Sequence, residues 1–390
     1  MKLSARVERI QPSLTLAITA QAKALRAAGK DVVSFAAGEP DFPTPAPICE
    51  AAIEAIRAGH TRYTPVDGIP QLKDAIRERY VREHGLQWDA DQVAVTVGGK
   101  QALFNLILAG VDHGDGVLIP APYWVSYPDQ VKVAGGEPQF VPTHVEHGFE
   151  LQPDDLEAAI RPNSKVLILT TPSNPTGAAI GAPALKSIAE ICERHGIWII
   201  SDEIYEKLVY DDFRHVSIAS VSDYAREHTV IVNGASKAYA MTGWRIGYMA
   251  GPRDWVRAAV KLQGQSTSNP TSIGQYATIA ALNLPAETLE TMRTTFERRR
   301  NLICGLLNDI DGVNCPVPRG AFYVFPDVSD AISDRFDSSF TFAEQLVEQC
   351  HVAVVPGEGF GAPGHIRLSY ACSDDDIERG IARIREFLGK

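Results

Sequence analysis

Short apolar runs alternate with helical patterns through the central part of the chain, from about residue 93 to residue 250. Parallel strands need long crossover connections, which helices normally supply, so this alternation predicts a largely parallel sheet covered by helices on both faces. Ligands bind to such sheets beyond the carboxyl ends of the strands, so residues that follow the apolar runs are the first candidates for a site. The expected strands are 92–97, 117–120, a run around Phe140, 165–171, 197–201, 229–232 and 246–250.

A second, smaller folding unit is expected from the C-terminal part of the chain. A long, charged helical pattern follows Pro285, and helices separate strand patterns at 320–325, 352–355 and 365–370. We therefore predict an α/β protein with a large domain of residues 47–288 and a smaller α+β domain formed by residues 1–46 and 289–390. The arginines at 298–300 are interpreted as a solvated face of the long helix.

Charge and cysteine content exclude several classes of protein. The chain of 390 residues carries a formal net charge of −11, which disfavours general binding to nucleic acid or to an anionic membrane. Its six cysteines are scattered without metal-ligand spacing, so we expect free thiols in a reducing compartment and no metal site.

The N-terminus lacks the apolar core of a signal peptide, and no apolar run could span a bilayer. A cytoplasmic protein is expected.

Three of the expected strands end in residues that could carry chemistry. Asn174 lies in the Asn-Pro turn after one strand, Asp202 directly follows a second, and Lys237 follows a third. An aspartate at the end of an apolar strand is partly desolvated and must find a cation or an N–H partner. Lys237 and the later Arg245 suggest a reactive amine beside an anion site, whereas composition alone would allow two solvated cations in a loop.

Other candidates lie at a glycine turn, an aromatic loop and a C-terminal strand. Gly99 and Lys100 lead from a strand into a helix, whose free N–H groups can bind an anion, although a plain turn fits the pattern equally well. Trp124 follows the strand 117–120 and could stack on a planar ring or only pack. Arg367 alternates with apolar residues and would clamp a carboxylate if its face turns toward the cleft.

Together these residues meet the needs of pyridoxal phosphate, which must be held covalently on an amine, protonated at its ring nitrogen, fixed in its ring plane and held by its phosphate. Lys237 would be the covalent lysine, and Asp202 would keep the ring nitrogen charged. The remaining assignments are Asn174 and Tyr205 at the ring phenolate, Trp124 on the ring, Gly99, Lys100 and Arg245 at the phosphate, and Arg367 at the substrate α-carboxylate.

Essentially the whole chain resembles the class I aminotransferases of fold type I. The glycine-turn and aromatic-loop motifs are similar to the bacterial branch of aspartate and aspartate/prephenate enzymes. The resemblance implies a homodimer in which Tyr63 reaches the other subunit's phosphate, a cofactor contact at Ser236, a backbone contact of Gly38 with substrate, and Ser13 and Thr15 over the site. The motifs are Tyr63-Thr-Pro-x-x-Gly68, Gly98-Gly-Lys-Gln, Pro122-Tyr-Trp-Val-Ser-Tyr, Asn174-Pro-Thr-Gly, Ser201-Asp-Glu-Ile-Tyr, Ser236-Lys-Ala-Tyr-Ala-Met-Thr-Gly-Trp-Arg and Ile366-Arg-Leu-Ser-Tyr.

The implied activity is ping-pong transfer of an amino group between aspartate or glutamate and a 2-oxo acid such as 2-oxoglutarate or oxaloacetate. Lys237 should have a depressed pKa, because the reaction needs its neutral amine. Lys100 would hold the second carboxylate of the substrate, unless it only neutralises phosphate. Relatives that use prephenate carry a lysine just before Pro-Ser, where this chain has Gln11, so weak or no use of prephenate is expected.

Other activities stay open at this stage. Broader specificity for aromatic amino acids or alanine, and a carbon–sulfur lyase on the same fold, are compatible with the same motifs. A nicotinamide-dependent dehydrogenase could explain the alternating pattern, but the dinucleotide fingerprint is missing.

Overall fold

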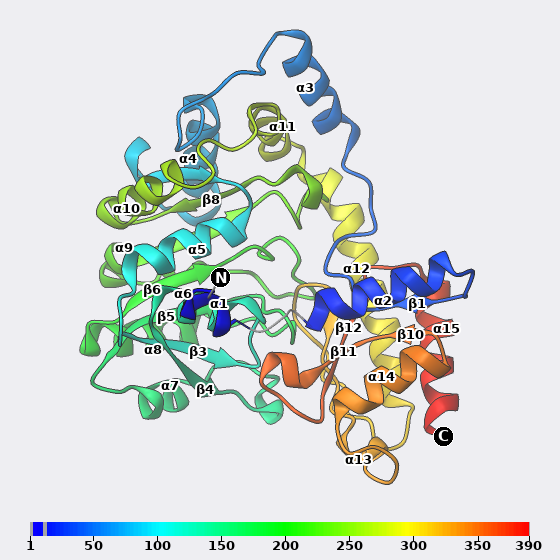
Figure 1. Ribbon diagram of the computed structural model, residues 1–390. Helices are drawn as coiled ribbons and strands as arrows, with labels where there is room; N and C mark the ends of the chain where they lie inside the picture. Colours follow the sequence, from blue (N-terminus) through cyan, green and yellow to red (C-terminus); the bar gives the residue numbers. More distant parts are fainter. Residues whose placement is uncertain (1–2, 11–13, 390) are drawn as a thin grey trace.

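A seven-stranded sheet forms the centre of the larger part of the molecule in a computed structural model, which describes residues 3–10 and 14–389 (Figure 1). Strand β8 runs antiparallel between β2 and β7, and all other neighbours in the sheet are parallel. The predicted largely parallel sheet is confirmed. In spatial order the strands are β2 (Val93–Thr96), β8 (Gly247–Ala250), β7 (Thr229–Gly234), β6 (Trp198–Asp202), β5 (Ser164–Thr170), β3 (Gly116–Ala121) and β4 (Glu137–Pro142).

Helices cover both faces of this sheet. Successive strand residues point to opposite sides, so a strand that is apolar throughout offers apolar side chains to a helix layer on each face. In β5, Val166 and Ile168 pack against one group of helices, while Leu167 and Leu169 pack against the other. The first group is α5 (Gly99–Gly110), α6 (Ser126–Ala134) and α10 (Arg253–Gly264). The opposite face carries α7 (Pro153–Ala159), α8 (Ala182–His195) and α9 (Asp223–His228), with α3 (Ala46–Arg57), α4 (Pro70–His84) and α11 (Ser272–Leu282) beside β2 and β8.

The smaller part is built on two short sheets and a separate apolar core. Its antiparallel strands have the order β11-β12-β9, and N-terminal β1 pairs with β10, which brings residues 33–34 into this part. The domain limits at residues 47 and 288 stay a prediction. The elements are α2 (Leu14–Ala27), β1 (Val33–Ser34), α12 (Ala286–Asn308), β9 (Tyr323–Val324), α13 (Ser329–Ile332), α14 (Ser339–Gln349), β10 (Val352–Ala353), β11 (Val355–Pro356), β12 (Ile366–Ser369) and α15 (Asp374–Leu388).

The arginine run on the long helix α12 corrects an expectation. Arg299 and Arg300 are buried, and only Arg298 is exposed. Arg300 pairs with Asp211, and Arg299 pairs with Asp41 and with Asp374 at the start of α15. The predicted solvated face is therefore wrong for two of the three residues, because acidic partners from distant segments allow these guanidinium groups to be buried.

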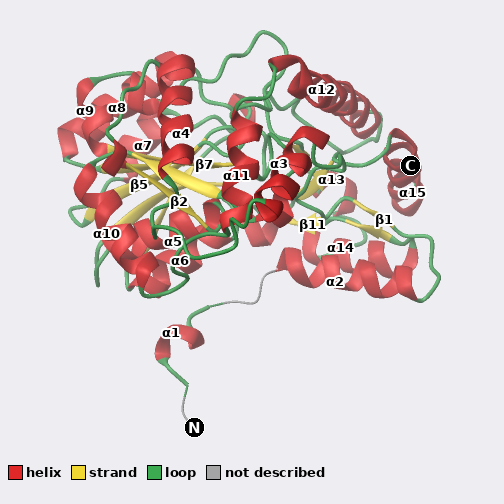
Figure 2. Cartoon of the chain, turned by 90° about the horizontal axis from the view of Figure 1, so that it is seen from above, coloured by secondary structure: helices red, strands yellow, loops and turns green. Residues whose placement is uncertain are grey.

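Helix α1 (Ala5–Glu8) lies outside the three sheets, on the side of the molecule where α6 lies (Figure 2). Over residues 3–10 and 14–389, none of the helices combines the length and the hydropathy of a bilayer-spanning segment.

Candidate active site

A cavity of about 390 Å³ opens where β5 and β6 end, beside the N-terminus of α5. The carboxyl ends of parallel strands meet at one edge of a sheet, so residues that follow different strands come together there. The cavity brings together most of the predicted site residues: Gly38, Gly99, Lys100, Trp124, Asn174, Asp202, Tyr205, Ser236, Lys237, Arg245 and Arg367.

Lys237 lies in the loop after β7, with its amine inside the cavity. Its Nζ donates a hydrogen bond to the carbonyl oxygen of Gly38 and lies 5.9 Å from the ring centroid of Tyr205. Burial lowers the pKa of this amine to about 8, although the charge of Glu39 acts in the opposite direction. An amine with a lowered pKa is available as a nucleophile and as a proton acceptor near neutral pH.

Asp202, the last residue of β6, is buried with 6% of its surface exposed. The hydroxyl of Tyr127 donates to its Oδ2 over 2.7 Å, and the backbone N–H of Ile204 donates to its Oδ1 over 3.3 Å. Burial nevertheless raises the pKa of this carboxyl to about 6. A carboxylate in this setting is stabilised by a protonated, positively charged group of a ligand.

Arg367 on β12 is buried, with 2% of its surface exposed. Its Nη1 donates to Asn174 Oδ1 over 3.0 Å and its Nη2 to the carbonyl oxygen of Ala36 over 2.8 Å. The Nε is buried without a hydrogen-bond partner among the described residues. Burial lowers the pKa of this guanidinium, and it also lies 4.7 Å from the ring centroid of Tyr323. A buried guanidinium with neutral partners and an orphaned N–H can bind a carboxylate strongly.

The other end of the cavity is an anion cradle at the start of α5. Gly98 has φ +80°, and a Cβ on it would lie 2.5 Å from Arg245 Nη2, so glycine is what allows the guanidinium to approach this turn. Lys100 Nζ lies 4.8 Å from the ring centroid of Trp124. Burial, followed by the charge of Arg245, lowers the pKa of Lys100. Helix N-terminus, lysine and guanidinium together suit a phosphate.

Three predicted site residues are not placed in the cavity. Tyr63 is 92% exposed in the loop before α4 and does not line it. Ser13 lies outside the described residues, and Thr15 belongs to α2, where its side chain is not described. Two residues were missed as site candidates: Tyr127, which donates to Asp202, and Tyr323, whose hydroxyl lies 2.9 Å from that of Tyr205. The only signal for Tyr127 was its place at the end of the Pro-Tyr-Trp-Val-Ser-Tyr motif.

The fold and the lysine at its strand edge define the class of the protein, the fold type I aminotransferases. The family model for aminotransferase class I and II matches residues 30–384. The chain is 50% identical to the aspartate aminotransferase of Geobacillus stearothermophilus, over 100% of this chain and 99% of that protein. It is 50% identical to the aspartate/prephenate aminotransferase of Cereibacter sphaeroides, over 99% and 98%. The solved structure of Thermus thermophilus aspartate aminotransferase with maleate aligns with a TM-score of 0.94 at 44% identity, over 99% of each chain. The chain therefore belongs to the class I and II aminotransferase family.

Enzymes of this family use pyridoxal 5′-phosphate, and the cavity fits that group. The buried Asp202 carboxylate suits a protonated ring nitrogen, and the cradle at Gly98 and Arg245 suits a phosphate. The Lys237 amine with its lowered pKa suits the covalent bond to the cofactor's aldehyde.

Proposed function

We propose that this enzyme transfers the amino group of aspartate or glutamate to a 2-oxo acid such as 2-oxoglutarate or oxaloacetate. One observation carries the proposal. Four cationic side chains line a single cavity, and none of them forms an ion pair with a carboxylate of the described residues: Lys100, Lys237, Arg245 and Arg367. A cavity of this kind favours ligands that bring several negative charges, such as a phosphate and a dicarboxylic amino acid.

We assign the residues that would hold the cofactor as follows. Asp202 takes the ring nitrogen, Asn174 and Tyr205 donate to the ring phenolate, and Trp124 stacks on the ring. The phosphate is held by the backbone of Gly99 and by the side chains of Ser236 and Arg245, with Lys100 nearby. When bound, the cofactor supplies an electron sink for the negative charge that develops at the substrate's α-carbon.

Lys237 is assigned the proton transfer. Its neutral amine can accept the proton from the substrate's α-carbon, and its pKa of about 8 leaves a substantial neutral fraction near neutral pH. Arg367 orients the substrate by its α-carboxylate and fixes which α-bond faces the amine. The carbonyl oxygen of Gly38, which accepts from Lys237 Nζ, places the amine on that side of the cavity.

Lys100 is proposed to bind the side-chain carboxylate of the substrate. Its ammonium lines the cavity against Trp124, and it projects from the first turn of α5. The relative from Thermus thermophilus was solved with maleate, a dicarboxylate, which supports a substrate of this kind. Ser13 and Thr15 stay predicted contacts. The resemblance implies a lysine just before Pro-Ser in enzymes that use prephenate, whereas this chain has Gln11, which lies outside the described residues, so kcat/KM should be higher for oxaloacetate than for prephenate.

We also propose that the enzyme is a cytoplasmic homodimer with composite sites. Tyr63 is 92% exposed, and the preceding helix α3 exposes Ile53 and Ile56, an apolar surface that a second subunit would cover. The six cysteines are free thiols, in keeping with a reducing compartment. Sedimentation of an active monomer would contradict the dimer.

The experiment that tests the function is a half-reaction. The enzyme is incubated with aspartate without an oxo-acid acceptor, and its absorption spectrum and products are followed. We expect the spectrum to change, oxaloacetate to form in an amount limited by the number of active sites, and the original spectrum to return when 2-oxoglutarate is added. A carbon–sulfur lyase would instead leave aspartate unreacted, and without an acceptor it would continuously release ammonia and pyruvate from an amino acid that carries a thiolate leaving group on Cβ.

A further inference from the structure

The side chains from Asp202, at the end of β6, to Glu206 point in two directions. Asp202 and Tyr205 line the cavity. Glu203 and Glu206 are buried away from it, among a set of side chains that we call the rear cluster: Arg79, His84, Glu203, Glu206 and His215. None of these rear-cluster residues lines the cavity.

Glu203 is fully buried and is held at both carboxylate oxygens. Its Oε1 accepts hydrogen bonds from the hydroxyls of Ser201 and Ser217 over 2.8 and 2.7 Å, and its Oε2 lies 3.2 Å from His215 Nε2. Its backbone N–H donates to the carbonyl oxygen of Val232 on β7, the strand that leads to Lys237. The residue next to Asp202 is therefore fixed by side chain and backbone at once.

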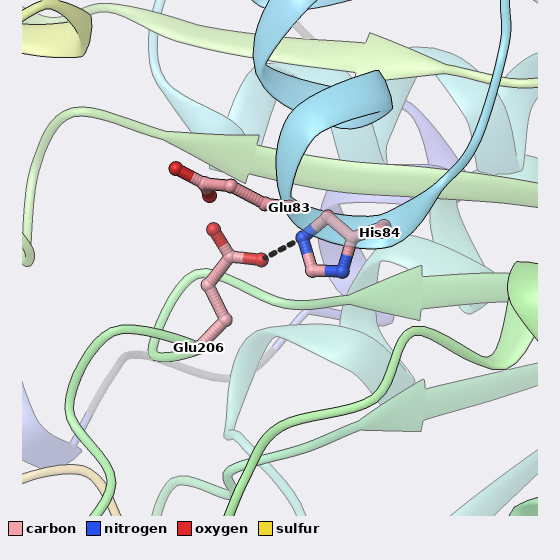
Figure 3. Close-up of side chains that lie close together, drawn as sticks. All are labelled: Glu83, His84 and Glu206. Atoms are coloured by element: carbon pink, nitrogen blue, oxygen red, sulfur yellow. Dashed lines mark hydrogen bonds and ion pairs between the residues drawn. The ribbon is translucent and has the colours of Figure 1, made fainter.

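Glu206 provides a second anchor on the same face. Its carboxylate forms an ion pair with Arg79 and lies 3.1 Å from His84 Nε2 at the end of α4 (Figure 3). Arg79 also pairs with Glu83 over 2.9 Å and donates to the hydroxyl of Tyr248 on β8. The rings of His84 and His215 meet at right angles, with centroids 5.9 Å apart, so the two anchors are in contact.

Metal binding is an alternative function for these residues. Ligand atoms lie close together in two groups, which are Glu83, His84 and Glu206, and Glu203, Glu206 and His215. However, the protein itself already supplies cations that neutralise carboxylates of this cluster. The Arg79 guanidinium ion-pairs with Glu83 and Glu206, and Lys207 pairs with Glu83 over 2.6 Å. A divalent cation would have to enter beside these charges, so the cluster is better explained as a fixed support.

We propose that Glu203 is a positioning residue that holds Asp202 in its place in the cavity, with Glu206 as the second anchor of the same segment. Asp202 cannot shift without moving the adjoining Glu203, and a buried carboxylate with three partners resists such a shift. This inference rests on the proposed function, in which Asp202 holds the cofactor's ring nitrogen.

The test measures the dissociation constant of pyridoxal phosphate with cofactor-free enzyme, from pH 5 to pH 8, for wild type and Glu203→Gln. The substitution keeps the size of the side chain and removes its charge. We expect the dissociation constant to rise about tenfold at neutral pH. We also expect the acidic midpoint of binding to move to lower pH. Asp202 faces Tyr127 from α6 and Lys237 from the loop after β7, and the neighbouring charge of Glu203 helps to raise its pKa.

Asp211→Asn is the control, because it likewise replaces a carboxylate by an amide of the same size, at a residue that pairs with the buried Arg300 away from the cavity. Its dissociation constant and midpoint should equal those of wild type even if its melting temperature falls. If Glu203→Gln does not fold, His215→Asn removes one partner of Glu203, and a rise of about threefold is expected. Wild-type affinity and midpoint in the folded variant would overturn the inference.

Asp202→Asn separates this inference from the function on which it rests. If Asp202→Asn binds the cofactor weakly while Glu203→Gln binds it normally, only the positioning role fails. If Asp202→Asn itself binds like wild type, the assignment of Asp202 in the proposed function fails.

Discussion

The cavity and the rear cluster bury charge in opposite ways, although they share one segment of chain. In the rear cluster, Arg79 has two carboxylate partners, so its charge is neutralised within the protein. In the cavity, the acceptors of Arg367 and Lys237 among the described residues are neutral oxygens, those of Asn174, Ala36 and Gly38. A buried charge without a counter-ion lowers stability, and a fold keeps it where a ligand supplies the missing charge. The rear cluster is therefore neutralised by its own residues, whereas the cations of the cavity await the negative charges of a ligand.

The largest expected effect comes from removing the charge of Asp202, the only carboxylate among the described residues that line the cavity. Asp202→Asn keeps the shape of the side chain but loses the charge that would hold a protonated ring nitrogen. We expect kcat to fall about 10²- to 10³-fold, with a smaller change in KM, in steady-state assays with aspartate. Near wild-type kcat would show that another group holds the ring nitrogen.

The second prediction concerns the free energy of unfolding of the cofactor-free protein, which the buried charge of Lys237 should lower. Its pKa is about 8 in the folded protein against an ordinary value of 10.5. Below pH 8 the amine is protonated in both states, so the folded protein bears the full cost of burying the charge. Between pH 8 and 10.5 the folded protein releases the proton first, and this cost disappears.

Cofactor-free Lys237→Met should therefore be more stable than wild type by roughly 3 kcal/mol below pH 8, and the difference should close as the pH rises toward 10.5. Urea unfolding at several pH values measures this. A difference in unfolding free energy that does not change with pH would contradict the lowered pKa.

The smallest expected effect concerns the choice of substrate. Lys100→Ala removes the cation proposed for the side-chain carboxylate, so kcat/KM for aspartate should fall about 10- to 100-fold, and less for alanine or phenylalanine. Lys165→Ala is a control, since that lysine pairs with Asp115 at the surface. An equal loss for aspartate and alanine would assign Lys100 to the phosphate alone.

Much of this cavity could be predicted from the sequence because its residues follow apolar strands. Asn174, Asp202 and Lys237 are far apart in the chain, but the carboxyl ends of parallel strands lie at one edge of the sheet. Periodicity and turn residues thus predict both the sheet and the place of its site. Family resemblance added the roles, and the residues assigned to hold and use the cofactor stay predictions that the experiments above address.

The rear cluster could not be predicted in the same way. His84 and Glu206 are 122 residues apart, and neither position stands out in the local pattern. Arg299 and Arg300 show the same limit, because their burial depends on Asp41, Asp374 and Asp211 from other segments. Long-range pairing of charges decides whether a charged side chain is buried, and periodicity within one helix does not contain that information.

The central claim is that this cavity holds pyridoxal phosphate on Lys237. The direct measurement is borohydride reduction of the holoenzyme, followed by proteolysis and mass spectrometry of the labelled peptide. The account predicts a stable phosphopyridoxyl group on Lys237 and on no other lysine. A label on Lys100 or on any other lysine, with Lys237 unmodified, would contradict it.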